Sequence, residues 1–349
     1  MEITLIEFIS QVVQNPTYLV VVLLIFAVVL VNGWTDAPNA IATCVSTRSL
    51  SPKKSIILAS IFNFLGVLIM CMISGAVAET IYNMVDFGSN NIDSLIGLCA
   101  GMFAVVIWAV VACLFGIPTS ESHALIAGIT GAAIALQGFA AINGAEWIKV
   151  IYGLIISLFV GFILGFIIVR IIEKICKNMI RSKTLKFFKY GQICSASFMA
   201  FMHGAQDGQK FIGVFLLATY LVNGIALSST FEIPVWLMIL CSIIMTTGTS
   251  IGGYRIIKKV GIGMVKLEKY QGFAADLAGA TCLLGSTIAG IPVSTTHTKT
   301  SAIMGVGTSK RLSNVNWSIA KEMILAWLLT FPGCGLLGWG SAYLFIQIF

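Results

Sequence analysis

Charged residues are scarce in this sequence of 349 residues, in which only 10% of the side chains are Asp, Glu, Lys or Arg. A soluble domain carries roughly 25% charged residues, so water cannot be the main solvent of this surface. Hydrophobic residues make up 58% of the chain. Several apolar runs reach or approach the roughly 20 residues that cross a bilayer as a helix. The composition therefore predicts an all-α polytopic membrane protein embedded in the lipid bilayer.

The sequence also lacks paired cysteines and a basic leader. Its nine cysteines are scattered singly without a CxxC pair, so we expect neither disulfides nor a metal cluster, and no cofactor. Glu2 and Glu7 are the only charges before the first apolar run, and no cleavage site of small residues follows it. This pattern indicates a first transmembrane helix and argues against a cleaved signal peptide.

The net charge of +7 comes from basic residues in particular loops. Four segments are rich in Lys and Arg: 48–54, 170–189, 255–269 and 310–311. The connections 82–93 and 222–233 contain neither residue. By the positive-inside rule the first group is cytoplasmic and the second external. We therefore expect a multi-pass protein of the plasma (inner) membrane of a prokaryote with both termini external, and no binding of nucleic acid.

The basic segment 170–189 divides the chain into two halves, 1–180 and 181–349. It contains seven Lys or Arg, which fits either a surface helix on anionic lipid headgroups or a solvated linker. Each half is expected to cross the membrane an odd number of times, so the second half is inverted relative to the first. Loop charge thus predicts two inverted-topology repeats that together form one transmembrane domain.

Two motifs occur once in each half and support this repeat. N-G-W-T-D-A-P-N begins at Asn32, and H-G-A-Q-D-G-Q-K begins at His203. Further along, G-I-P-T-S-E-S-H begins at Gly116, and G-I-P-V-S-T-T-H begins at Gly290. The aspartate of the first motif precedes the histidine of the second by 87 residues in one half and by 90 in the other. The same order at nearly equal spacing is strong evidence for an internal repeat.

The aspartate motifs predict broken helices at mid-membrane. Asp36 ends an apolar run and is followed by Pro38, which cannot continue an unbroken helix. Asp207 lies among the glycines 204, 208 and 213. A charged aspartate at this depth costs about 2.5–3.5 kcal/mol on insertion scales. Two of them in equivalent positions therefore indicate function, with capping of two half-helices as the alternative.

The second motif predicts a re-entrant helical hairpin whose helix begins inside the membrane. Pro118 and Pro292 are expected in the first helical turn, where a missing N–H does no harm. The hydroxyls that follow are those of Ser120, Ser122, Ser294, Thr295 and Thr296. Together with the positive end of a helix dipole they form an anion site. The alternative is an ordinary capped helix, which needs only one hydroxyl.

Several ionisable residues near these motifs have an open role. We expect His123 and His297 to hydrogen-bond their own backbone, with proton transfer as the alternative. Lys299 either neutralises an anion or pairs with a carboxylate such as Asp276. The residues whose roles stay open are Lys210, Lys299 and Glu121.

Carboxylates repel an anion, so two aspartates beside two anion-binding tips require a further positive charge. Either a cation lies between each aspartate and the anion, or the anion carries its own proton and donates it in a hydrogen bond. Phosphate carries such a proton near neutral pH, whereas sulfate does not. The residues therefore predict coupled transport of a protonatable oxyanion with a cation.

At both pairs of motifs the sequence resembles the inorganic phosphate transporter (PiT) family, and the resemblance covers essentially the whole chain. It implies secondary active import of inorganic phosphate by symport with H⁺ or Na⁺, alternating access at the repeat interface, and a homodimer. The substrate-binding residues that it implies are Asp36, Asn39, Thr119, Ser120, Ser122, Asp207, Gln209, Ser294, Thr295 and Thr296. Ion coupling is implied at Asn32, Asp36 and Asp207, with Na⁺ as a candidate at the two aspartates.

The motifs depart from the G-A-N-D-V-x-N-A that is typical of the sodium-coupled members. Thr35 and Gln206 precede the two aspartates, and we read Gln209 as the replacement of the second asparagine. The coupling ion therefore stays open. Some bacterial relatives carry sulfate, so a sulfate permease is the alternative. A hydrolase built on Ser120 and His123 is remote, because both tips lack the G-x-S-x-G of a nucleophile elbow, and we expect no enzyme activity.

Overall fold

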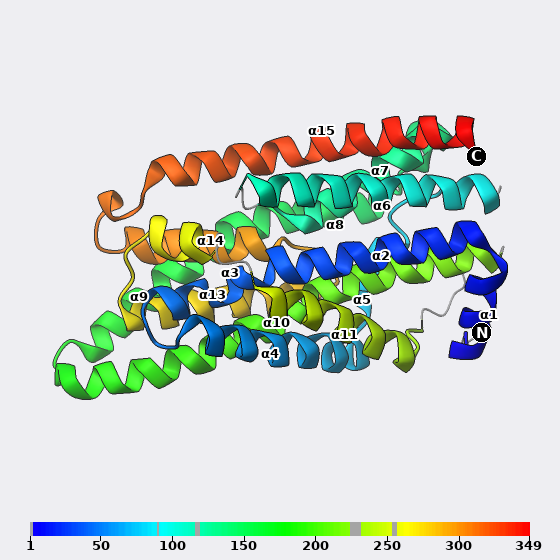
Figure 1. Ribbon diagram of the computed structural model, residues 1–349. Helices are drawn as coiled ribbons and strands as arrows, with labels where there is room; N and C mark the ends of the chain where they lie inside the picture. The colour runs from blue at the N-terminus through cyan, green and yellow to red at the C-terminus, as the bar shows by residue number, and fades with distance from the viewer. Residues whose placement is uncertain (1–2, 89–90, 116–118, 224–231, 253–256) are drawn as a thin grey trace.

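The computed structural model describes residues 3–88, 91–115, 119–223, 232–252 and 257–349, which form one bundle of helices (Figure 1). Apart from two isolated β-bridges, these residues contain no strand pairing. The all-α class predicted from composition is confirmed.

Nine α-helices form the described part of the first half: α1 (Leu5–Gln14), α2 (Pro16–Thr35), α3 (Ala37–Ser46), α4 (Pro52–Ile73), α5 (Ala76–Tyr82), α6 (Asn91–Leu114), α7 (Glu121–Gln137), α8 (Gly144–Ile155) and α9 (Gly161–Cys176). Five follow in the described part of the second half: α10 (Arg181–Asn223), α11 (Val235–Ile251), α13 (Lys269–Ile288), α14 (Thr295–Thr308) and α15 (Trp317–Ile348). Four shorter helical turns lie between them: η1 (Gly138–Ala141), η2 (Ile156–Val160), η3 (Ile257–Gly263) and η4 (Leu312–Asn314).

Short polar residues between the apolar runs set where the long helices begin. Asn15 caps α2 by accepting the N–H of Tyr18 at 3.1 Å, and Pro16 occupies the first helical position. Asn316 caps α15 in the same way by accepting the N–H of Ile319. These caps satisfy backbone donors that an apolar surrounding would otherwise leave unpaired.

Six helical spans among the described residues are long and apolar enough to cross a membrane: Pro16–Ser46, Pro52–Ile73, Asn91–Ala112, Glu121–Ala141, Gly144–Cys176 and Trp317–Ile348. Their outer faces carry large apolar side chains such as Ile57, Phe159 and Leu328, each at least 60% exposed. Exposed apolar faces of this size are favourable in contact with lipid tails and unfavourable in contact with water. The chain is therefore a multi-pass membrane protein.

Both chain ends lie at the same end of the bundle, and the turn from α9 to α10 lies at the opposite end (Figure 1). The indole N–H of Trp236 donates to the carbonyl of Ile3 at 2.9 Å, which joins the start of α11 to the N-terminal segment. The basic segment 170–189 is mostly helical, because it forms the exposed ends of α9 and α10 around a short turn. The basic turn and the two chain ends therefore lie at opposite ends of the bundle, which is compatible with the expectation from loop charge.

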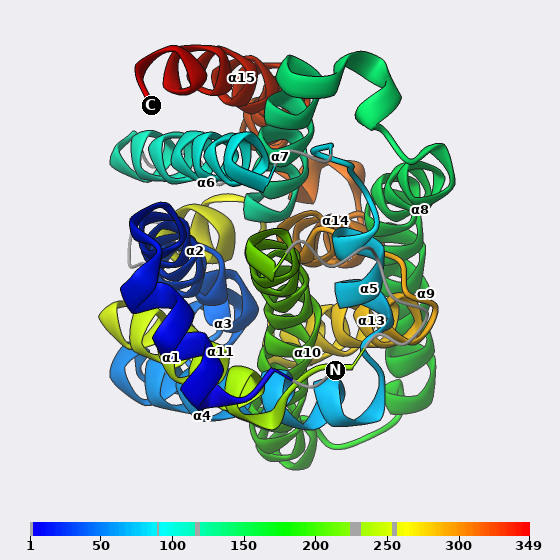
Figure 2. The ribbon, with the colours of Figure 1, turned by 90° about the vertical axis from the view of Figure 1, so that its right-hand side faces the viewer.

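Helices of the two halves pack in reciprocal pairs around a central α10 (Figure 2). The first-half helix α7 packs chiefly against α15 of the second half, whereas α14 of the second half packs against α9 of the first. In the same way α10 packs on α4, and α11 packs on α2. These exchanges are compatible with two inverted repeats that share one core.

The predicted break at Asp207 is wrong, although the one at Asp36 is present. α10 runs without interruption from Arg181 to Asn223, through Asp207 and its neighbouring glycines. Those glycines allow close packing, because a Cβ at Gly204 would collide with the backbone of Asn63 in α4. The glycines of α10 therefore allow two helix backbones to approach closely, and they do not interrupt the helix.

This contact predicts that Gly204→Ala lowers the stability of the folded protein. The added methyl must push α10 away from α4, and overpacking of a tight interior costs roughly 1–3 kcal/mol. Thermal unfolding in detergent measures the loss as a lower Tm. Gly285→Ala in α13 is the control, because a Cβ there meets no atom within 4 Å. Equal midpoints for the two variants would contradict the proposed role of Gly204.

Candidate functional site

α2 and α3 meet at Asp36, in the buried interior of the bundle. α2 ends at Thr35 and α3 begins at Ala37, with Pro38 in its first turn. Pro38 has no N–H and cannot extend the hydrogen bonds of α2 through the junction. Asp36 is only 2% exposed. The sequence pattern therefore places a carboxyl group at a helix junction inside the spanning region, as predicted.

The second pair of motifs forms two buried helix starts. Ser120 caps α7 by accepting the N–H of His123 at 3.3 Å. Ser294 caps α14 by accepting the N–H of His297 at 3.2 Å. We call the first turns of α7 and α14 the two tips. Their N-termini lie in the interior, as predicted, where the free N–H groups and the helix dipole favour negative charge.

Pro292 is not in the first turn of its helix, where we predicted it. Pro292 precedes the capping Ser294 by two residues and lies in an extended segment outside α14. The extended backbone turns two carbonyls toward α10, since Gln206 donates to the carbonyl of Ile291 at 2.8 Å and Lys210 to that of Val293 at 2.6 Å. Residues 116–118, which include Pro118, lie outside the described residues.

Each aspartate is bound by the tip of the other half. The hydroxyl of Thr296, on α14, donates to Oδ1 of Asp36 at 2.8 Å. The hydroxyl of Ser122, on α7, donates to Oδ1 of Asp207 at 3.3 Å. Ser122 and Thr296 occupy the same position in their motifs. The contacts thus join residues 85 and 260 positions apart and repeat the same geometry twice.

Asp207 is completely buried, and both of its carboxyl oxygens have donors. Oδ1 accepts from Lys210 at 2.7 Å as well as from Ser122. Oδ2 accepts from Asn32 at 3.2 Å and from Thr295 at 3.1 Å. Four groups therefore satisfy one buried carboxyl, and Lys210 supplies a charge of opposite sign in the same place.

Asp36 has fewer donors. The amide of Asn39 donates to Thr296 at 2.9 Å, and Thr296 in turn donates to Asp36. Next to Asp36, the hydroxyl of Thr35 donates to Oε1 of Glu121 at 3.3 Å. Among the described residues, no donor reaches the buried atoms Oδ2 of Asp36, Oδ1 of Asn39 and Oε2 of Glu121. This cluster therefore holds three acceptor oxygens that a proton or a cation could satisfy.

Some of the predicted site residues use their polar atoms in hydrogen bonds away from the two aspartates. Gln209 lies apart from the two aspartates in its contacts, because its Oε1 accepts the N–H of Val77 in the first turn of α5 at 3.1 Å. Ser120 and Ser294 direct their oxygens to the amides that they cap. Thr119 is buried beside the first cap. The contacts therefore concentrate at Asn32, Asp36, Asn39, Ser122, Asp207, Thr295 and Thr296.

The assignment of Gln209 as the replacement of the second asparagine is wrong. Counted from the aspartates, Asn39 and Lys210 both lie three residues on, and Gln209 corresponds to Pro38. The structure gives Asn39 and Lys210 matching contacts, because each donates to the tip hydroxyl of the other half. The position that carries an amide in one half carries an ammonium in the other.

Lys299 pairs with a carboxylate. Its ammonium contacts Asp276 and donates to the hydroxyl of Thr43 at 3.2 Å, all in the buried interior. Thr43 also donates to Asp276 at 2.6 Å. Of the two roles left open by the sequence, the ion pair is the one present. Asp276 and Thr43 belong to no motif; the sequence suggested Asp276 as a partner of Lys299 and did not indicate Thr43.

The two tip histidines do not hydrogen-bond their own backbone through the imidazole, contrary to our expectation. His123 and His297 contact each other edge to face, with ring centroids 4.3 Å apart. His297 also lies against Trp327, at 3.8 Å between centroids. Neither ring nitrogen of His297 has a hydrogen-bond partner among the described residues. The imidazoles therefore act in packing between the tips, and only the main-chain N–H groups take part in the caps.

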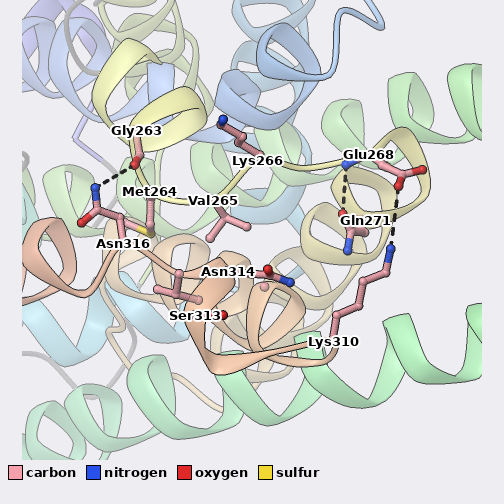
Figure 3. A pocket seen from close by; sticks show the side chains of 12 residues that line it. Gly263, Met264, Val265, Lys266, Glu268, Gln271, Lys310, Ser313, Asn314 and Asn316 are labelled. Atoms are coloured by element: carbon pink, nitrogen blue, oxygen red, sulfur yellow. Dashed lines mark hydrogen bonds and ion pairs between the residues drawn. The ribbon is translucent and has the colours of Figure 1, made fainter.

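A cavity of about 680 Å³ opens at the far end of the second hairpin and is separate from the tips (Figure 3). It is lined by the end of α14 at Gly307, by Gln271 and by the connections around Lys266, Lys310 and Asn316. α14 has 14 residues, so a rise of about 1.5 Å per residue puts its end roughly 20 Å from its tip. None of the predicted site residues lines this cavity.

Known proteins are similar to this chain over most of its length. The model of the phosphate transporter family matches residues 32–338. A Bacillus subtilis protein named "probable low-affinity inorganic phosphate transporter" is 38% identical over 319 residues, which cover 91% of this chain and 94% of that protein. A Rhizobium meliloti protein of the same name is 37% identical over 310 residues, covering 88% and 90%.

A solved structure, described as "The sodium-dependent phosphate transporter", has the same fold. It superposes with a TM-score of 0.87 at 20% identity and covers 96% of this chain and 100% of that one. The family match extends over both aspartates, both tips and most of α15. The chain therefore belongs to the phosphate transporter family, whose members are membrane transporters and not enzymes.

Proposed function

We propose that this chain is a secondary active transporter that imports inorganic phosphate by symport with a cation. The observation that carries the proposal is the reciprocal contact between aspartates and tips, Thr296 to Asp36 and Ser122 to Asp207. It sets two carboxyl groups beside two buried helix N-termini at the interface of the two halves. A site of this kind attracts an anion through the tips and a cation through the carboxyl groups.

The two attractions explain why transport is coupled. An anion that enters beside Asp36 and Asp207 alone meets like charge and loses its hydration shell, which is unfavourable in a low-dielectric site. A sodium ion or a proton that enters with it cancels this repulsion. Phosphate also brings a proton near neutral pH and can donate it to a carboxylate. Cation and phosphate therefore bind better together than apart.

The coupling ion is Na⁺ or H⁺. The sodium-dependent phosphate transporter that shares this fold supports sodium, and three buried oxygens without donors around Asp36 suit either ion. The residues before the aspartates, Thr35 and Gln206, support protons, because they depart from the motif of sodium-coupled members. Uptake in proteoliposomes with sodium and pH gradients imposed separately decides between them.

The rest of the proposal concerns the assembly. The halves 1–180 and 181–349 act as inverted repeats that move against each other in alternating access around the tips. The basic loops support a topology with both termini outside, in the plasma membrane of a prokaryote and with the protein working as a homodimer in the lipid bilayer. A sulfate permease is the second candidate, and sulfate that blocks uptake of labelled phosphate at equal concentration would favour it.

We expect Asp36→Asn and Asp207→Asn each to reduce accumulation of labelled phosphate in proteoliposomes by at least about tenfold. Hydrogen bonds to a charged group contribute about 1.5–3 kcal/mol, and about 1.4 kcal/mol is a factor of ten. Asp86→Asn is the control, because Asp86 lies exposed before α6. Near-normal uptake by both site variants, with normal membrane insertion, would contradict the mechanism.

We expect Thr296→Val to raise the phosphate concentration at half-maximal uptake by about tenfold or more. The change removes the donor to Asp36 and the acceptor of Asn39 while it keeps the shape of the side chain. Thr308→Val, at the far end of the same helix, removes a hydroxyl that bonds only to the carbonyl of Gly305 and serves as the matched control. An unchanged half-saturation for Thr296→Val would remove the tip hydroxyl from the site.

A further inference from the structure

We propose that Lys210 is a tethered cation: its ammonium occupies the place of a mobile cation at Asp207, so that the coupling cation binds only at the cluster of Asp36, Asn39 and Glu121. The inference rests on the proposed function and assigns the two halves different parts in it. It also replaces the sequence-based expectation of a sodium ion at both aspartates.

The contacts of the ammonium are those of a bound cation. Nζ of Lys210 donates to Oδ1 of Asp207 at 2.7 Å, to the hydroxyl of Ser122 at 2.6 Å and to the carbonyl of Val293 at 2.6 Å. An ammonium has three hydrogens, and these contacts use all of them. Carboxylate, hydroxyl and carbonyl oxygens are also the ligands that hard metal cations take from proteins. The site around Asp207 is thus a cation site whose cation belongs to the chain.

The same position in the first half has no such charge. Asn39 corresponds to Lys210 and reaches the tip hydroxyl of Thr296 as Lys210 reaches that of Ser122. A carboxamide carries no charge and cannot neutralise Asp36. The two halves therefore share a geometry and differ by one positive charge at equivalent positions.

The unpartnered oxygens follow this difference. Both oxygens of Asp207 have donors. Oδ2 of Asp36, Oδ1 of Asn39 and Oε2 of Glu121 have none among the described residues, although all three are buried. A buried acceptor without a donor costs about 1–3 kcal/mol. A cation that binds this cluster removes that cost. Beside Asp207 the unpartnered oxygen is Oδ1 of Asn32, an uncharged amide whose nitrogen donates to Asp207, so a second cation gains less there.

Lys210 is also not placed to bind phosphate directly. Its side chain is completely buried, and its three hydrogens are used on protein oxygens. Release of the ammonium toward an anion would leave the charge of Asp207 without its closest partner, which is strongly unfavourable in the interior. The role of Lys210 is therefore to neutralise Asp207 throughout transport.

The test removes the site for the mobile cation and then opens a second one. Binding of radioactive sodium to purified protein in detergent is measured for Asp36→Asn and for Asp36→Asn combined with Lys210→Asn. Asparagine is the residue that the first half has at the position of Lys210. We expect no sodium at the tips of Asp36→Asn, and a gain of about one sodium ion per chain in the double variant, since the freed oxygens of Asp207 form an oxygen site.

Lys210→Met in the same Asp36→Asn background is the matched control. Methionine fills most of the space of the lysine stem but brings neither charge nor oxygen, so no sodium should bind. If the double variant is lost from the membrane, Lys210→Asn alone is assayed, and it should bind about one sodium ion more than the unaltered protein.

Two results would overturn the proposal. The first is a folded Lys210→Asn protein that gains no sodium in either background. The second is sodium bound by Asp36→Asn alone and lost when Asp207→Asn is added, because a mobile cation would then share Asp207 with Lys210. Neither readout uses phosphate. Failure of the proposed function would instead appear as absent phosphate uptake by the unaltered protein, whatever the sodium result.

Discussion

The hydrogen bond between a tip hydroxyl of one half and a buried aspartate of the other is the contact on which the rest of the site depends. A carboxyl group in the bilayer interior is tolerated only when polar partners surround it, and here each aspartate takes at least one of those partners from the other half. Thr296 serves Asp36, and Ser122 serves Asp207. Asp207 also accepts from Thr295 on the tip of its own half, whereas the hydroxyl donor to Asp36 comes from the other half. The polar centre is therefore a property of the interface, and it connects binding to the relative position of the halves.

The two centres are alike in backbone and unlike in chemistry. Each has an aspartate, a residue three positions on that contacts the opposite tip, and a capped helix start. At Asp207 the ammonium of Lys210 neutralises the carboxylate. At Asp36 and Glu121, buried carboxyl oxygens have no donor among the described residues. α2 breaks at its aspartate, whereas α10 continues through Asp207. The two positions match in the sequence motifs, and single side chains make their contacts different.

Much of this arrangement could be predicted from the sequence, because membrane insertion is governed by local patterns. Apolar runs predict the membrane-spanning helices, and the hydroxyl-rich motifs predict two helix starts in the interior. Pro38 correctly indicates the break before α3, since a missing N–H acts within one turn. Glycines were misleading at Asp207, because whether a glycine loosens a helix or receives a neighbour depends on a partner such as Asn63, far away in the sequence.

The contacts within the site were harder to predict for the same reason. The match of Asn39 to Lys210 is visible in the sequence when residues are counted from the aspartates, and it required only that count. The pairing of Lys299 with Asp276, and of Thr35 with Glu121, depends on how hairpins from different parts of the chain meet. Periodicity and motif spacing do not reveal contacts between distant segments. The sequence analysis therefore left two roles open for Lys299 and named no partner for Glu121.

The reciprocal packing of α7 on α15 and of α14 on α9 has a consequence for biosynthesis. α7 is almost entirely buried up to Ala133, and its chief neighbour is the last helix of the chain. During translation α7 is made well before α15, because α8 to α14 lie between them in the chain. The face of α7 that packs on α15 therefore lacks this partner while that part of the chain is synthesised.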